Sequence, residues 1–373
     1  MPQTHNTRFF SFPLRPLYGL ILGLALLGMS LSGCRGQAAP AWPGLALQAE
    51  RLYVVAGAQV VALNPDTGTS LWYFAPEGKT FFTTPPALLQ TAKDNALLVV
   101  GDQQGNLYAL DPNTGKPRWQ YENNGYPFIA RVAYAQGLLL APSSSGTLYA
   151  LDAQGQVRWT FTATAPLWAE AVVHEGTAYL VSMDRHLYAL DVGTGRLLWK
   201  ENLDAAMAHG PLLHQGRLYI GTYGRGVKAF DLATRKVLWT ALENAWVWHT
   251  PQMGEDTLYV GTSQGTVAAL DPETGQVRWS REMGAAVIAR PGWDPQRKTL
   301  YVATEDGGLW ALQAQDGRVQ WSRQEEAWDK KLYTEPLTNG SLLFLALHTG
   351  AEPAVLALDP DTGQVLWAFP AKE

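Results

Sequence analysis

Short apolar runs, each separated from the next by turn residues, fill most of this chain. In one stretch the pattern predicts four strands, at residues 129–135, 138–141, 147–151 and 156–161. Turn residues separate all four, so consecutive strands can pair as antiparallel neighbours. A four-stranded unit of this kind is the first element that the sequence predicts.

A tryptophan recurs near the end of each unit, at intervals of 40 to 47 residues. A glycine stands four residues before it in seven of the eight copies, and Arg235 stands there in the remaining copy. An alanine precedes the turn in every copy. A period near 40 is a signature of propellers and solenoids. The eight tryptophans are Trp72, Trp119, Trp159, Trp199, Trp239, Trp279, Trp321 and Trp367.

The turn before each tryptophan is clearest between Asp111 and Gly115, which reads Asp-Pro-Asn-Thr-Gly. Pro fixes φ, and the Asp carboxylate can accept local backbone N–H bonds. Gly115 supplies the left-handed conformation that turns the chain back. We therefore expect the turn at Arg235 to be strained or altered.

A four-stranded unit cannot bury both of its faces alone, so neighbouring units must cover it. We predict an all-β fold, a single eight-bladed β-propeller of four-stranded antiparallel blades over residues 43–373. Each tryptophan is then a large ring packed between blades. An open solenoid is the alternative, but the first and last copies keep the full pattern without polar capping repeats. The inner strand expected near 43–48 and the outer strand near 364–369 give no sign of a strand exchanged between the termini.

The first residues have the features of a lipoprotein signal peptide. Arg8 and Arg15 precede an apolar run over 17–31, which ends at Leu31-Ser32-Gly33-Cys34. The run is shorter than the roughly 20 residues that a transmembrane helix needs, so a retained membrane helix is the weaker alternative. We expect residues 1–33 to be removed, Cys34 to carry lipid and residues 34–42 to form a tether.

Net charge and cysteine content exclude several classes of partner and site. Without Arg8 and Arg15, 26 Lys and Arg remain against 33 Asp and Glu, a net charge of −7, so nucleic acid is not an expected partner. Cys34 is the only cysteine, which excludes an internal disulfide, a Cys-based metal cage and a Cys-x-x-Cys-His haem attachment.

The pattern Ala-x-Asp-x-x-Thr-Gly-x-x-x-Trp, complete from Ala109 to Trp119, resembles the tryptophan-docking motif of the pyrroloquinoline-quinone-type repeat family. The motif is also complete at 189–199, 269–279 and 357–367, while other copies depart from it, as Asn64, Gln313 and Arg235 do. The resemblance covers residues 43–370 and is specific for fold but weak for function.

That family includes quinoprotein dehydrogenases and BamB-like lipoproteins that scaffold outer-membrane β-barrel assembly. The resemblance to the second group is closer, in lipobox, mature length and blade number. Quinoprotein alcohol dehydrogenases carry an adjacent cysteine pair and a calcium site, and this chain has neither the pair nor a matching acidic cluster. The resemblance therefore implies no cofactor and no pyrroloquinoline quinone.

Motifs for catalysis or metal binding are not found in the sequence. The histidines share no ligand spacing, and Asp359-Pro360-Asp361 repeats the turn seen elsewhere rather than forming a calcium loop. No Gly-x-Ser-x-Gly, Walker or His-Glu-x-x-His motif is present. We expect no catalytic residues and no metal site.

The crossings from each outer strand to the next inner strand are rich in aromatic residues, whereas the outer hairpins are polar. Aromatic enrichment on one face is typical of a recognition surface, although such rings can also fill the gaps between blades. The binding-face candidates are Tyr126, Phe128, Trp168, Trp246, Trp248 and Trp328.

The same crossings lead into the inner strands and predict a polar channel mouth. Aligning these entries places Thr84 and Gly210 with the channel-mouth candidates Arg131, Glu170, Thr250, Arg290 and Glu335. We expect Arg131 to pair with Glu170 and Arg290 with Glu335, either to hold blades together or to orient a peptide or ligand.

The leading hypothesis is a non-catalytic, membrane-anchored scaffold, BamB-like, in outer-membrane or envelope protein assembly. We expect a monomer within a hetero-complex, bound to an envelope protein such as an outer-membrane β-barrel assembly component. The lipid places it outside the cytoplasm, on the outer membrane facing the periplasm or on the outer face of the cytoplasmic membrane. The alternatives are a quinoprotein-type or other small-ligand enzyme that uses the channel, and an extracytoplasmic sensor module.

Overall fold

The computed structural model describes residues 44–48, 50–78, 80–92, 95–324, 332–347 and 354–370. The leader, Cys34 and the tether lie outside these residues. The described chain consists of strands joined by turns, and it contains no helix long and apolar enough to cross a membrane. Residues from Pro40 to Glu373 form one compact unit.

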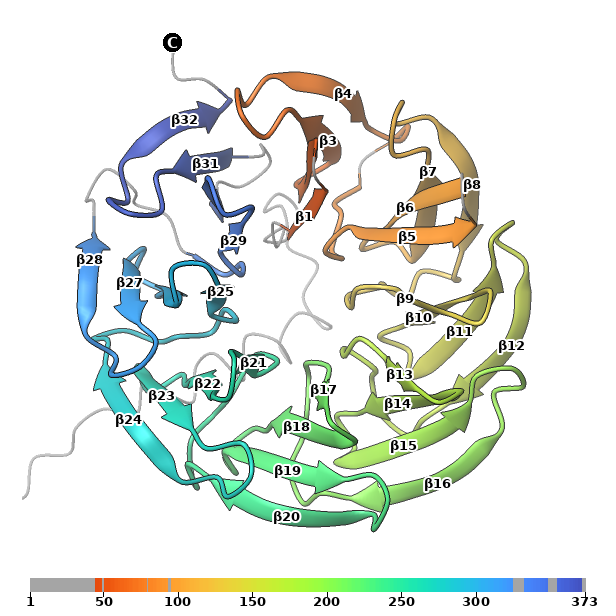
Figure 1. Cartoon of the computed structure of the whole chain (residues 1–373). Helices are drawn as coiled ribbons and strands as arrows, with labels where there is room; N and C mark the ends of the chain where they lie inside the picture. The colour runs from red at the N-terminus through yellow and green to blue at the C-terminus, as the bar shows by residue number, and fades with distance from the viewer. Residues whose placement is uncertain are drawn as a thin grey trace, which may run out of the picture. The chain divides into compact units, whose positions relative to one another are not determined.

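The strands form eight four-stranded antiparallel sheets arranged as blades around a ring (Figure 1). In each blade the strands pair in chain order. Blades 1 to 4 are β1 (Gly44–Gln48), β2 (Arg51–Ala56), β3 (Gln59–Leu63), β4 (Ser70–Phe74); β5 (Ala87–Ala92), β6 (Asn95–Gly101), β7 (Asn106–Leu110), β8 (Pro117–Glu122); β9 (Ala133–Ala135), β10 (Leu138–Pro142), β11 (Thr147–Asp152), β12 (Val157–Thr162); β13 (Val172–His174), β14 (Thr177–Val181), β15 (His186–Asp191) and β16 (Leu197–Asn202).

Blades 5 to 8 repeat this order around the rest of the ring. They are β17 (Leu212–His214), β18 (Arg217–Gly221), β19 (Val227–Asp231), β20 (Lys236–Ala241); β21 (Gln252–Met253), β22 (Leu258–Gly261), β23 (Thr266–Leu270), β24 (Val277–Glu282); β25 (Gly292–Asp294), β26 (Thr299–Ala303), β27 (Leu309–Gln313), β28 (Val319–Arg323); β29 (Leu337–Thr338), β30 (Leu343–Leu347), β31 (Ala354–Leu358) and β32 (Val365–Phe369). The predicted fold, an eight-bladed β-propeller, is confirmed.

The inner strand of blade 3 is shorter than the sequence predicts. The strand expected at 129–135 spans only Ala133–Ala135, and the chain before it pairs only through an isolated bridge between Phe128 and Ser143. The other three strands of this blade lie within one residue of their predicted bounds. The crossings therefore supply much of the wall at the entrance to the ring.

The alanine and tryptophan of each repeat are cross-strand partners, as Ala109 and Trp119 are between β7 and β8. Directly paired residues project to the same face of a sheet, so the small alanine leaves room for the indole beside it. A bulge follows the alanine in every blade, between Ala109 and Leu110 in this one. The alanine therefore recurs in the sequence pattern because a larger side chain would occupy the space of the indole.

Each seam between blades is closed by the tryptophan of one blade docking on the turn of the next. The Trp72 indole Nε1 donates to the Pro112 carbonyl at 3.0 Å, and its ring lies against Gly115. Gly115 has φ +69°, and a Cβ there would overlap the ring, so the position requires glycine for both reasons. Indole-to-carbonyl bonds of 2.9 to 3.1 Å close six further seams.

The ring closes through the same contact rather than through a shared strand. Trp367 of the last blade donates to the Pro65 carbonyl of the first blade at 3.1 Å and lies against Gly68. The cores of the two blades also join, with Phe344 and Val355 packed beside Leu52 and Val54. First and last blades each consist of four consecutive strands, as their sequence pattern indicates.

The seam at Trp199 is the exception. Arg235 keeps the left-handed conformation of the missing glycine, with φ +55°, and its guanidinium lies 5.3 Å from the centre of the Trp199 ring. A non-glycine residue in this region is strained, and a cation over an indole offsets part of that cost. The expected strain is therefore present, although the turn keeps the left-handed φ of the equivalent glycines in the other blades.

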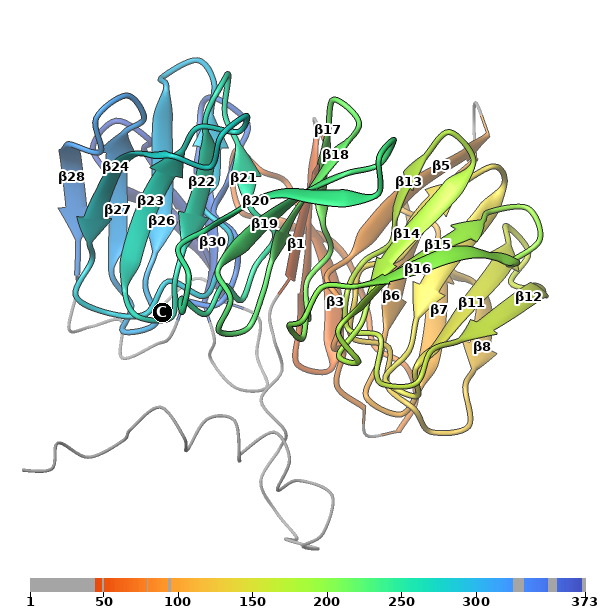
Figure 2. The same cartoon turned by 90° about the horizontal axis from the view of Figure 1, so that it is seen from below.

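Antiparallel order fixes which loops share an end of the ring (Figure 2). In every blade the hairpins between the first and second strands and between the third and fourth lie at one end, here called the hairpin face. The crossings between blades and the hairpins between second and third strands lie at the other end, here called the crossing face. The two faces differ in how their polar groups are satisfied.

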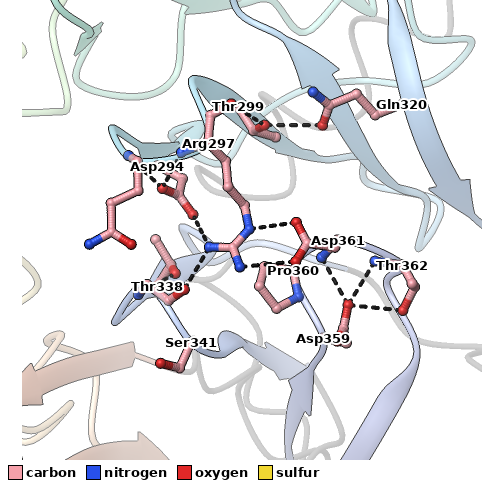
Figure 3. Close-up of polar contacts among 12 residues, drawn as sticks. Asp294, Arg297, Thr299, Gln320, Thr338, Ser341, Asp359, Pro360, Asp361 and Thr362 are labelled. Carbon is pink, nitrogen blue, oxygen red and sulfur yellow. Dashed lines mark hydrogen bonds and ion pairs between the residues drawn. The ribbon is translucent and has the colours of Figure 1, made fainter.

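Between blades 7 and 8 the hairpin face carries a network of charged groups (Figure 3). Arg297 donates from Nε to one carboxylate oxygen of Asp361 at 2.6 Å and from one terminal nitrogen to the other at 3.0 Å. Its second terminal nitrogen contacts the buried Asp294 carboxylate at 3.2 Å and the Gly340 carbonyl at 2.6 Å. The fork of a single arginine thus ties together three loops.

Candidate binding sites on the crossing face and in the channel

The predicted binding-face aromatics fall into different environments. Tyr126 and Trp246 are exposed, by 54% and 42%, while Trp168 and Trp248 are half-buried. Trp328 lies outside the described residues. The prediction for Phe128 is wrong, because its side chain is fully buried.

Phe128 belongs to the core between blades 2 and 3. Its ring meets Tyr121 and Tyr149 edge-on, with centroids 6.5 and 5.9 Å away, and Leu139 lies in the same apolar cluster. Its carbonyl accepts a hydrogen bond from Thr83 Oγ1 at 2.5 Å. Partner rings from two blades enclose Phe128, whereas Tyr126 two residues earlier projects outward.

Three rings on the crossing face contact one another in a triangle, here called the aromatic stack. The Tyr223 ring centroid lies 5.6 Å from that of Trp246 and 4.8 Å from that of Trp248, with interplanar angles of 19° and 31°. Trp246 and Trp248 are themselves 6.3 Å apart at 23°. The half-buried Tyr223 and Trp248 support the outer ring, so the exposed indole of Trp246 is held in place rather than free to rotate.

Sequence reasoning missed Tyr223. The residue follows β18, in a hairpin between second and third strands, and the search for aromatics covered only the crossings. Antiparallel order places both kinds of loop at the same end of the ring, so extending the search to these hairpins would have found it.

The channel-mouth residues occupy equivalent positions, each two residues before the first residue of an inner strand. Arg131 precedes β9, Glu170 precedes β13, Thr250 precedes β21, Arg290 precedes β25 and Glu335 precedes β29. Thr84 does not belong with them. It stands three residues before β5, where blade 3 has Ala130, and its buried hydroxyl accepts a hydrogen bond from the Gly101 N–H at 2.6 Å.

The charged residues converge inside the ring. Arg290 Nε lies 3.8 Å from a carboxylate oxygen of Glu335, so the predicted pair is present. Arg131 donates to the Leu45 carbonyl of blade 1 at 3.3 Å, a partner that the sequence did not indicate. Arg131, Glu170, Thr250 and Arg290 line one pocket of about 250 Å³, so side chains from four blades meet there.

Blade 5 gives this pocket its space, because Gly210 stands where its neighbours carry side chains. A Cβ at Gly210 would lie 2.7 Å from the Glu170 carbonyl oxygen, so the close approach of blades 4 and 5 requires glycine. Thr250 Oγ1 donates to the Gly210 carbonyl at 2.7 Å and fixes blade 6 on the other side. The remaining wall is apolar, formed by Val172, Pro211, Leu212 and Leu213.

Burial inside the ring shifts the ionisable groups. It raises the pKa of Glu170, an effect that the Arg131 and Arg290 charges oppose. Burial also raises the pKa of Glu335, against the same two arginines. It lowers the pKa of the buried His249 to about 4; surrounding protein atoms also lower the pKa of His209 to about 4, although its side chain is exposed to solvent. Both imidazoles are therefore neutral at neutral pH.

His249 has a structural role beside the channel. Its Nε2 accepts a hydrogen bond from the Gly261 N–H at 2.9 Å, and its Nδ1 lies 2.8 Å from the Thr250 carbonyl oxygen. Both contacts suit a neutral imidazole with the proton on Nδ1. Within the described ranges, no three His, Cys, Asp or Glu side chains are grouped so that they could hold a metal ion.

The chain matches a known protein family over most of its length. The family model described as outer membrane protein assembly factor BamB matches residues 34–127, 103–225, 144–290 and 224–372. BamB of Yersinia pestis is 27% identical over 175 residues, which are 44% of this chain and 43% of the relative. The tetrathionate hydrolase of Acidithiobacillus ferrooxidans is 28% identical over 162 residues, 39% of this chain and 31% of that protein. The chain thus spans less than half the length of either relative.

A solved structure shares the fold. BamB from Moraxella catarrhalis has a TM-score of 0.69 to this chain, at 20% sequence identity. The alignment covers 84% of this chain and 92% of the BamB chain. At this identity the likeness concerns the arrangement of the blades. The residues of the aromatic stack and of the channel pocket must be interpreted from this structure.

Proposed function

The chain belongs to the family described as outer membrane protein assembly factor BamB, and from that membership we propose that it is a non-catalytic scaffold for outer-membrane or envelope protein assembly. Its partner is an envelope protein, an outer-membrane β-barrel assembly component. It works as a monomer within a hetero-complex and uses no cofactor.

The observation that best supports a scaffold is the stacked, exposed Trp246. Large aromatic rings that are rigid before binding lose little conformational freedom when a partner covers them. Trp246 stacks on Tyr223 and remains 42% exposed, so it can bury its outer surface against a partner. Hairpin and crossing backbone around it can offer further hydrogen bonds.

We place the scaffold outside the cytoplasm, held by lipid on Cys34. The lipobox and single cysteine support this, and residues 34–42 then form the tether. The membrane is the outer membrane facing the periplasm, or the outer face of the cytoplasmic membrane. Replacement of Cys34 by serine should prevent lipid attachment and release the chain from membrane fractions, and labelled palmitate found on the variant would contradict this.

A photo-crosslinking residue at position 246 tests the proposed surface. In envelopes that carry the full chain, irradiation should give an adduct with a β-barrel assembly component, identified by mass spectrometry. The control is the same residue at position 113, since Asn113 is exposed on the hairpin face. Adducts of equal yield at both positions, or none at 246, would count against a partner on the crossing face.

The enzymatic alternative rests on relatives such as the tetrathionate hydrolase. The alignment covers 31% of that protein, so its activity is not carried over. A quinoprotein-type role would instead place a ligand in the channel.

A further inference from the structure

The channel pocket combines positively and negatively charged side chains with an apolar wall. The contacts among the described residues do not occupy all of the hydrogen-bonding groups on these side chains. Arg131 and Arg290 line it together with Glu170, and both of their charges act on the Glu170 carboxylate. The lining therefore carries two cations and one carboxylate. The Glu335 carboxylate, 3.8 Å from Arg290, brings the net charge of this region close to zero.

Two buried donors in this site have no acceptor. Neither Arg131 Nε nor Arg290 Nε has a hydrogen-bond partner among the described residues, although both atoms are shielded from solvent. A buried N–H without an acceptor costs free energy, more so on a charged group. Both arginines line the pocket, so the guanidinium nitrogens that face it can donate to a carboxylate bound there.

The apolar wall and the volume limit the rest of the ligand. Val172, Leu212 and Leu213 face the same space of about 250 Å³, which is below the range of roughly 300 to 1,000 Å³ typical of sites for drug-sized molecules. Such a pocket takes a compact aliphatic group rather than a large ring system. Glu170 remains available on the same wall for a cationic group.

We propose that this pocket binds the zwitterion of a small aliphatic α-amino acid. The guanidinium groups of Arg131 and Arg290 hold its carboxylate, Glu170 holds its ammonium group, and Leu212 and Val172 contact its side chain. The proposal is independent of the scaffold role, which concerns the crossing face and a macromolecular partner.

Three related compounds test the proposal by calorimetry and ligand-observed NMR on the full chain in detergent. L-leucine carries both charges, N-acetyl-L-leucine lacks the ammonium group, and L-leucinamide lacks the carboxylate. We expect L-leucine to bind at least about tenfold more tightly than either analogue, a difference of about 1.4 kcal/mol. No binding of L-leucine, or equal binding of all three, would overturn the proposal.

The substitution Glu170→Gln assigns the ammonium site. This near-isosteric change should weaken L-leucine by about tenfold and leave N-acetyl-L-leucine almost unchanged, so the preference between the two disappears. Arg118→Gln is the matched control, because it removes a guanidinium that pairs with Asp111 far outside the pocket. A Glu170→Gln protein that melts like the parent and keeps the full preference for L-leucine would contradict the assignment.

Discussion

The two ends of the described ring differ in how many buried polar atoms lack a hydrogen-bond partner. On the hairpin face, Asp111 Oδ1 accepts the N–H groups of Asn113 and Thr114 at 2.9 and 3.0 Å, and the tryptophan indoles donate across the seams. On the crossing face and in the channel, Trp168 Nε1, Trp248 Nε1, Arg131 Nε and Arg290 Nε are buried without a hydrogen-bond partner among the described residues. Arg51 Nε and Arg217 Nη1 are exceptions on the hairpin face.

This contrast separates stability from recognition. Polar groups that are satisfied within the chain stabilise the fold and have little left to offer a ligand. Groups left without partners cost stability, and they are retained where a bound molecule can complete them. Both faces thus hold blades together, the hairpin face through the indoles and the crossing face through bonds such as Thr164 to Asp184 at 2.7 Å, but within the described chain more unsatisfied donors lie on the crossing face and in the channel.

The largest expected effect comes from breaking a seam. Trp279→Ala removes a ring that packs between blades and donates to the Ala314 carbonyl at 2.9 Å, so it should lower the free energy of unfolding by about 3 to 5 kcal/mol. Trp246→Ala, at the exposed end of the aromatic stack, should cost less than about 1 kcal/mol. Denaturant titrations of both variants give the order, and the reverse order would show that core and surface have been exchanged.

The next effect concerns pH and the buried imidazole beside the channel. His249 has a folded pKa of about 4 against 6.5 when free, so the unfolded chain binds the proton more readily between these values. The stability that neutral His249 contributes is complete above pH 6.5 and is lost as pH falls toward 4, by roughly 3 kcal/mol. Unfolding of parent and His249→Gln should therefore be compared between pH 7 and 4.

The variant should lose less stability over this range than the parent does. Trp246→Ala serves as control, because it leaves the imidazole and its contacts in place and should keep the slope of the parent. Parallel curves for parent and His249→Gln would show that another group, such as His209, accounts for the loss of stability in acid.

Sequence predicted the blades well because their signals are local. A turn that needs glycine, an alanine opposite a tryptophan and a period near 40 each reflect contacts that recur in every copy, including the contact that closes the ring at Trp367 and Gly68. The strained turn at Arg235 could be anticipated for the same reason. Because the pattern recurs in eight copies, the assignment of a position in one copy could be checked against the same position in the others.

The binding surfaces were harder to predict because they depend on what differs between copies. Phe128 and Tyr126 are close in sequence, and only the rings of Tyr121 and Tyr149 from two blades decide which is covered. The contact between Arg131 and the Leu45 carbonyl joins residues from the third and first blades. Thr84 was misplaced by one position because the crossing from Trp72 to β5 is one residue longer than the crossing from Trp119 to β9.

The smallest expected effect concerns calcium and pyrroloquinoline quinone. Adding both to the full chain should have no effect on the protein. The quinoprotein alcohol dehydrogenases that the repeats resemble carry an adjacent cysteine pair, and this chain has one cysteine, Cys34. The channel pocket has about 250 Å³, below the roughly 300 to 1,000 Å³ typical of sites for drug-sized ligands. We therefore expect neither a rise in melting temperature nor dye-linked oxidation of alcohols or aldoses.

A silent site would still be detected, because binding to the folded state alone adds RT ln(1 + [L]/Kd), about 2.7 kcal/mol at a hundredfold excess over Kd. Melting curves with calcium alone, with the quinone alone and with both separate a cation effect from a cofactor effect. A rise of several degrees that requires both, and that Arg131→Ala or Glu170→Ala abolishes, would place a quinone in the channel and favour the enzymatic alternative. If L-leucine raises the melting temperature and the quinone does not, the pocket is selective for a small zwitterion, and the two arginines of the channel are explained without redox chemistry.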